Sequence, residues 1–107
     1  MAAPTSTRRS KRIAVRFPAI VHAGVSQYRG ICVNVSTGGL AVELDPLPAV
    51  GDHLGIEVHL EDGRRIVAEG EVRHAGQRTP REAGVRFSTL EPASLIAIHS
   101  LVGRYGS

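Results

Sequence analysis

Hydrophobic and polar residues alternate in short runs along most of this chain. A period of two is typical of a β-strand with one buried and one exposed face, because successive side chains point to opposite sides. The alternation predicts strands at 28–36, 40–44, 54–60 and 66–72. In the first of these strands it places one set of side chains inside (Ile31, Val33 and Val35) and the other on a polar outer face (Cys32, Asn34 and Ser36).

Two shorter apolar runs predict a first and a last strand. Residues 17–22 are apolar and β-branched, and Pro18 favours the start or the edge of a strand. Residues 83–87 predict the last strand, with Val85 and Phe87 facing inward.

Glycine and proline mark the expected turns. Asp62-Gly63 lies between two alternating runs, which is the strongest short-range hairpin signal in the chain. Thr37-Gly38-Gly39 breaks the alternation, and we expect positive φ there. Gly70, inside a strand, suits a bend or bulge of the kind that closes a barrel. Loops are expected at 45–52 and 75–81.

The period of the apolar residues changes after Phe87. It becomes helical, and Pro92 and Gly103 suit the first turn and the stop of one amphipathic helix. Six short strands followed by this helix predict an all-β fold with one C-terminal helix, built as a six-stranded antiparallel barrel, because a flat sheet of this size would leave edges exposed. The apolar residues of the helix are Leu95, Ile98, Leu101 and Val102.

Positive charge is concentrated near the N-terminus. The chain has 13 Lys and Arg against 10 Asp and Glu, and five of these bases lie in 8–16 with no acid among them. The remaining eight bases leave the body at −2, while the arm carries +5. We expect a disordered segment at 1–7, a single domain at 8–103 that includes a flexible basic arm at 8–16, and a tail at 104–107. The arm fits a small, highly charged anion as well as a polymer.

Several kinds of chemistry lack the residues they need. No run approaches the roughly 20 apolar residues of a membrane span, and we expect a cytoplasmic protein. Cys32 has no second thiol for a disulfide or a shared metal. The five histidines show no ligand spacing, and no phosphate-binding loop, nucleophile elbow or acid/base carboxylate pair is visible. We therefore expect no enzyme, no metal and no cofactor.

Two motifs lie about twenty residues apart. Arg8 and Arg12 form Arg-x-x-x-Arg, and 34–39 reads Asn-Val-Ser-Thr-Gly-Gly, or Asn-x-Ser-x-x-Gly, at a strand end. Alone, the first reads as a solvated tail and the second as ordinary turn chemistry. Together and in this order they resemble the PilZ domain family, receptors for the bacterial second messenger cyclic di-GMP. The resemblance covers roughly 8–103 and includes Gly51-Asp52, Gly70-Glu71-Val72-Arg73 and Gly84-Val85-Arg86-Phe87.

The resemblance implies a split barrel with a binding site for cyclic di-GMP. Arginine suits both phosphate and the guanine O6/N7 edge, and Asn34 and Ser36 can hydrogen-bond a guanine edge or hold an arginine. It also implies that a mobile arm folds over the outer strand face around the ligand and presents a changed surface to an effector protein. No membrane or nucleic-acid polymer is expected as a partner. The implied ligand-binding residues are Arg8, Arg9, Arg12, Asn34, Ser36 and Gly39.

Two alternatives stay open. One is a PilZ-like adaptor that acts by protein contact without a nucleotide. The other is a small basic barrel that binds single-stranded nucleic acid, but that class relies on aromatic stacking platforms. This chain has only two Phe and two Tyr. Arg73 and Arg86 are candidate contacts on the outer face, although plain surface positions explain them as well.

Overall fold

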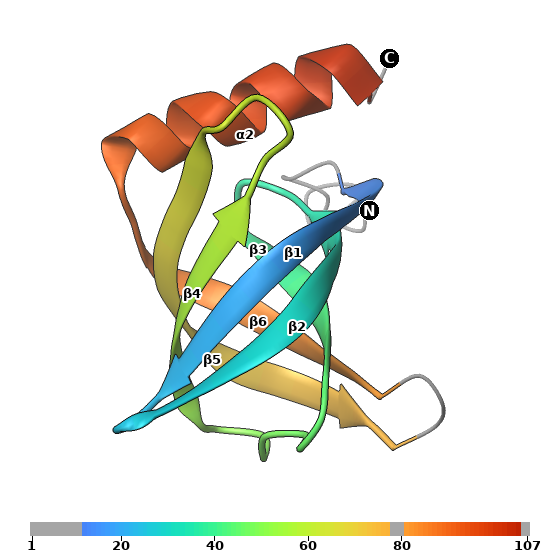
Figure 1. Cartoon of the computed structure of the whole chain (residues 1–107), viewed down its shortest axis with the longest axis vertical. Helices are drawn as coiled ribbons and strands as arrows, with labels where there is room; N and C mark the ends of the chain where they lie inside the picture. The colour runs from blue at the N-terminus through green and yellow to red at the C-terminus, as the bar shows by residue number, and fades with distance from the viewer. Residues whose placement is uncertain (1–11, 78–80, 106–107) are drawn as a thin grey trace, which may run out of the picture.

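The computed structural model describes residues 12–77 and 81–105, which form six antiparallel strands and one helix (Figure 1). The strands close into a barrel in the order β1-β2-β3-β6-β5-β4. This confirms the predicted all-β fold, a six-stranded antiparallel barrel with one C-terminal helix. The elements are β1 Ile13–Ala23, β2 Ser26–Val35, β3 Gly39–Leu44, β4 His53–His59, β5 Arg65–Gly76, β6 Glu82–Leu90 and α2 Pro92–Tyr105.

Pairing of β1 along both of its edges closes the barrel. One edge pairs with β2 and the other with β4. A shift of register between Glu69 and Gly70 lets β5 bend, as the sequence predicted at Gly70. A Cβ at Gly70 would overlap the backbone oxygen of Arg86, so only glycine allows the two strands to come this close.

Alternate residues of the strands fill the interior, and α2 lies across one end of the barrel (Figure 1). The alternation at 54–60 and 66–72 is reflected in β4 and β5, because the apolar side chains at alternate positions are all buried. Ala97, Ile98 and Leu101 of α2 close the end of the core. The buried residues of β4, β5 and the turn between them are Leu54, Ile56, Val58, Leu60, Ile66, Ala68 and Val72.

The prediction of which β2 side chains face inward is confirmed at Val35, which is fully buried, but is wrong for the residues before it. A bulge between Cys32 and Asn34 adds a residue to β2 opposite β3 and shifts the alternation. Cys32 therefore points into the core and is fully buried, whereas Ile31 and Val33 are half-buried. Ser36, expected on the outer face, is only 1% exposed.

The prediction of positive φ after β2 is also wrong. Among the described residues, positive φ occurs at Gly24, Gly51 and Gly63, the last in the predicted Asp62-Gly63 hairpin. Gly39 is needed for a different reason. A Cβ there would overlap the backbone oxygen of Val85 in β6.

Several element boundaries differ from the prediction. β1 begins at Ile13, so residues 13–16 belong to the barrel and not to an arm. β5 extends to Gly76, into the loop predicted at 75–81, and β6 continues to Leu90, past the predicted end at Phe87. The helix passes the expected stop at Gly103 and includes part of the expected tail. The predictions for 1–11 and 106–107 fall outside the described residues.

Two predicted core positions are less buried than expected. Leu95 is 39% exposed, because the face of α2 that meets the barrel runs through Ser94, Ala97 and Ile98. Phe87 is half-buried and packs against the edge of the core.

Candidate functional site

The two sequence motifs meet at the start of β1. Arg12 Nη1 donates a hydrogen bond to Asn34 Oδ1 at 2.6 Å. The contact forms because Ala14 lies opposite Asn34 in the β1–β2 ladder, which puts the residues just before β1 beside the end of β2. The structure thus brings Arg12 and Asn34 together, while Arg8 and Arg9 lie outside the described residues.

The corner between β2 and β3 is held by its own hydrogen bonds. Ser36 Oγ accepts from the Gly38 N–H at 3.1 Å and donates to the Gly39 carbonyl oxygen at 3.3 Å. The Ser36 N–H also donates to that oxygen, at 2.8 Å, and the Phe87 N–H of β6 donates to the Gly38 carbonyl oxygen at 2.9 Å. Ser36 therefore holds the corner through its buried side chain, and Gly39 holds it through its backbone carbonyl oxygen.

A row of small residues crosses the outer face beside this corner. Cross-strand partners point to the same side of a sheet, and the register places five such residues in one line across five strands. Three of them are alanine or glycine, and two of these, Ala41 and Gly84, are buried. The His74 ring lies against Gly84, where a Cβ would overlap it. The row runs through Ala14, Asn34, Ala41, Gly84 and His74.

Sequence reasoning missed His74 as a neighbour of the motifs. The sequence predicts a strand that ends at residue 72, which leaves His74 outside the sheet. A longer β5 brings it opposite Gly84. The alternation of β5 carries no signal for this, because a register shift between Val72 and His74 interrupts it.

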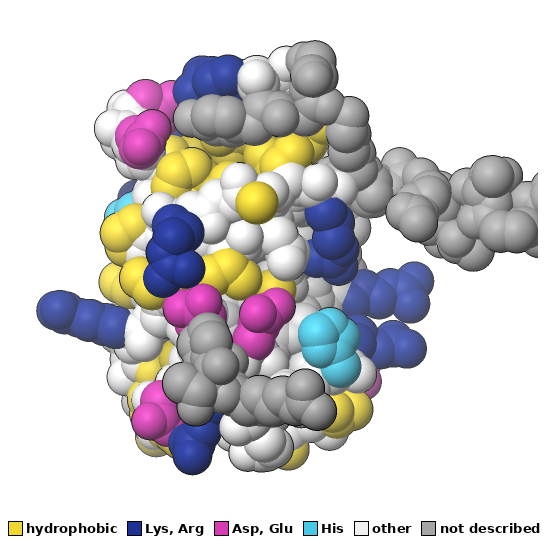
Figure 2. All heavy atoms as spheres, turned by 90° about the vertical axis from the view of Figure 1, so that its right-hand side faces the viewer, with side chains coloured by type: hydrophobic (Ala, Val, Ile, Leu, Met, Phe, Trp, Pro, Cys, Tyr) yellow, Lys and Arg dark blue, Asp and Glu magenta, His cyan; other side chains and the backbone are white. Residues whose placement is uncertain are grey.

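Two exposed arginine side chains, Arg16 and Arg86, lie on the strands of this outer face. The N-terminal end of β1 lies at the right of Figure 1, the side that Figure 2 turns to the viewer, where separate dark-blue side chains lie among pale, apolar and some acidic ones. Arg16 is paired with Glu43 of β3 through both carboxylate oxygens, at 3.3 and 3.4 Å. Arg86, opposite Gly39, is exposed.

Cys32 precedes Asn34 by two residues in β2, and its side chain points into the core. Its thiol donates to the Asn34 carbonyl oxygen at 3.4 Å. Burial raises the pKa of Cys32 to about 12, and the contact with the Asn34 backbone offsets only part of that rise. The thiol is therefore neutral over the physiological pH range, and it is not the reactive thiolate.

We expect Cys32 to react slowly with a thiol reagent such as dithionitrobenzoate at pH 8 in the native protein, and quickly in denaturant. The free energy of unfolding should also fall as the pH rises from 9 toward 12, because the unfolded thiol ionises first. Absorbance of the released thionitrobenzoate measures the rate. A native rate equal to that in denaturant would contradict the burial, and Cys32→Ala supplies the blank.

Neither a metal centre nor a membrane-spanning helix is found in the described residues. Within 12–77 and 81–105, no three His, Cys, Asp or Glu side chains are grouped to hold a metal ion. No helix in those same ranges is both long and apolar enough to cross a bilayer.

A family model described as the PilZ domain matches residues 6–104. The chain belongs to the PilZ domain family. The match spans both motifs, the barrel and nearly all of α2, so the Arg12–Asn34 contact joins two parts of one PilZ domain. A comparison with curated proteins found no match.

Solved structures share this PilZ fold. The inhibitor of motility MotI/DgrA of Bacillus subtilis aligns with a TM-score of 0.80 and 24% identity, over 91% of this chain and 50% of that one. The PilZ domain of YcgR from Escherichia coli, solved with c-di-GMP, aligns with a TM-score of 0.75 and 16% identity, over 92% and 91%. PlzA of Borreliella burgdorferi, in complex with c-di-GMP, aligns at 0.67 and 14%, over 91% and 41%. The chain thus spans about half of the MotI/DgrA structure.

Proposed function

We propose that this PilZ domain is a receptor for cyclic di-GMP, which binds at the outer face beside the β2–β3 corner. The observation that carries the proposal is the 2.6 Å contact between Arg12 and Asn34, which joins the two motifs in one place. Membership of the PilZ family supports it, as do similar folds solved with this ligand in YcgR and PlzA.

The chemistry of the contact suits a guanine nucleotide. Asn34 uses its Oδ1 atom to hold Arg12, which leaves the amide N–H groups to donate to guanine O6 or N7. Arg12 keeps further N–H donors for a phosphate. In this proposal Arg8 and Arg9 add positive charge, while Ser36 and Gly39 act through the shape of the corner.

The proposed output is a contact with an effector protein. A ligand held at the contact between Arg12 and Asn34 would change the surface at the start of β1, and an effector protein would recognise that changed surface. The proposal assigns no catalytic residue, and it places the protein in the cytoplasm.

Isothermal titration calorimetry tests the proposal. Cyclic di-GMP should bind the folded chain with micromolar or tighter affinity at physiological salt, and the same experiment gives the number of nucleotides bound. A single-stranded oligonucleotide titrated in parallel should give little heat. Heat from the oligonucleotide alone would favour the nucleic-acid alternative, and no heat from either would favour an adaptor that binds no nucleotide.

A further inference from the structure

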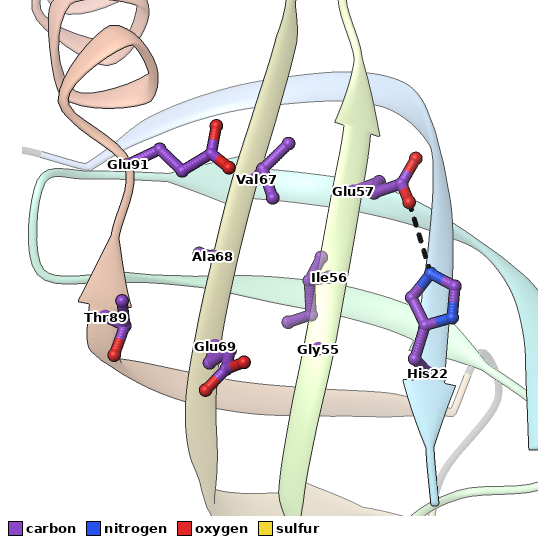
Figure 3. Close-up of a pocket in the computed structure, with 9 residues that line it drawn as sticks. All are labelled: His22, Gly55, Ile56, Glu57, Val67, Ala68, Glu69, Thr89 and Glu91. Atoms are coloured by element: carbon purple, nitrogen blue, oxygen red, sulfur yellow. Dashed lines mark hydrogen bonds and ion pairs between the residues drawn. The ribbon is translucent and has the colours of Figure 1, made fainter. Parts of the chain in front are cut away.

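A groove of about 330 Å³ lies on the outside of the barrel over β4 and β5 (Figure 3). Gly55 is at its centre, because its partners are His22 on one side and Glu69 on the other. Among the residues that the structure describes, neither motif contributes to this groove. The site proposed for the nucleotide lies at the opposite end of β1, beside Ala14.

The absence of a side chain at Gly55 opens the groove. Two strand spacings, about 10 Å, separate the strands that carry His22 and Glu69, and nothing projects between them. Val67, which is half-buried, and Thr89 add carbon surface at the edge. A Cβ at Gly55 would meet only the His22 side chain, at 3.5 to 4.0 Å, which is ordinary contact. Folding therefore does not require glycine here.

Three glutamates, Glu57, Glu69 and Glu91, lie at the rim of this groove, whose base is largely apolar. Glu57 contacts His22 Nε2 at 3.3 Å and Arg65 Nη1 at 3.6 Å. Glu69 contacts an exposed histidine, His53, at 3.3 Å, and pairs with no arginine among the described residues. Figure 3 shows the Glu91 side chain extending toward Val67 on the far side of the groove. The groove thus combines a flat apolar centre with a negative rim.

We propose that this groove is a docking site for an arginine side chain carried by an exposed segment of a partner protein. A guanidinium is planar and weakly hydrated, so it can lie on the apolar floor while its N–H groups reach a carboxylate in pairs. The volume is at the low end of small-molecule pockets, about 300–1,000 Å³, and it suits one side chain. The negative rim disfavours anions, so the proposal does not rest on nucleotide binding.

Amide NMR with a defined probe tests the proposal without any nucleotide. The probe is a blocked pentapeptide of glycine and serine with one central arginine, and its control replaces the arginine with neutral citrulline. We expect the arginine peptide to shift the amide resonances of Gly55, Ala68 and Thr89. Citrulline should cause less than a fifth of that shift.

Three variants separate the groove from general negative charge. Gly55→Val should fill the floor and weaken binding at least fivefold while leaving the fold intact, as should the double variant Glu69→Gln/Glu91→Gln. Glu61→Gln/Asp62→Asn removes two charges as well, at the exposed β4–β5 turn, and should change the affinity less than twofold.

Four results would overturn the docking site. Three of them are equal shifts with citrulline, shifts centred on residues 61–64, and displacement of the arginine peptide by an equal concentration of spermidine, which would indicate a site for diffusible cations. Absence of any shift up to 10 mM peptide, taken roughly as the weak limit of such contacts, would overturn it as well. None of these results bears on cyclic di-GMP binding.

Discussion

Gly39→Ala is expected to lower the free energy of unfolding by about 3 kcal/mol or more, which is the upper part of the range for overpacking. The new methyl group would overlap the backbone oxygen of Val85, and backbone cannot move aside as a flexible side chain can. For a domain of this size the melting temperature should fall by roughly 12 °C or more. Urea unfolding and thermal melts followed by circular dichroism measure both.

Gly76→Ala is the matched control. It adds the same methyl group to a strand glycine, but the nearest atom is the Glu82 carbonyl oxygen at 3.7 Å, an ordinary contact. Its free energy of unfolding should change by no more than about 0.5 kcal/mol. Equal effects of the two substitutions would show that close approach of β3 to β6 is not why position 39 is glycine.

The barrel could be predicted because its strands follow simple local rules. Leu54 to Leu60 alternate without interruption, the Asp62-Gly63 turn returns the chain, and Gly70 bends the next strand. Each of these signals acts within a few residues, so a single sequence contains it.

The predictions that were wrong depend on contacts between residues far apart in the sequence. The β2 bulge that turns Cys32 inward forms in the ladder with β3, and no residue pattern within β2 itself predicts it. The reason for glycine at position 39 lies on β6, at Val85, and not in its own backbone angles. Leu95 kept helical spacing but lost its place in the core, since the direction in which α2 crosses the barrel decides which face is buried.

The candidate site likewise contains residues that the motifs predicted and residues that only the folded structure brings together. The motifs named Arg12 and Asn34, and the structure places them in contact. The same motif included Ser36, but the structure buries its hydroxyl inside the corner. His74 and the groove at Gly55 depend on strand register, so only the folded chain shows them.

Arg12→Ala is expected to weaken cyclic di-GMP binding by about 10- to 100-fold. Hydrogen bonds to a charged group contribute about 1.5–3 kcal/mol, and about 1.4 kcal/mol corresponds to a tenfold change in affinity. The substitution removes the donors proposed for the phosphate and also the partner that holds Asn34 Oδ1. Calorimetry at physiological salt measures the loss, and the melting temperature should stay the same because Arg12 is exposed.

Two further variants separate the geometry of Arg12 from its charge. Arg12→Lys keeps the charge but loses the planar fork, so its affinity should fall between those of the native protein and Arg12→Ala. Arg65→Ala removes an equal charge from β5, beside Glu57 and away from both motifs, and should bind within twofold of the native protein. Native affinity in Arg12→Ala would show that another residue binds the ligand. An equal loss of affinity in Arg65→Ala would show that net charge, and not the Arg12–Asn34 contact, explains binding.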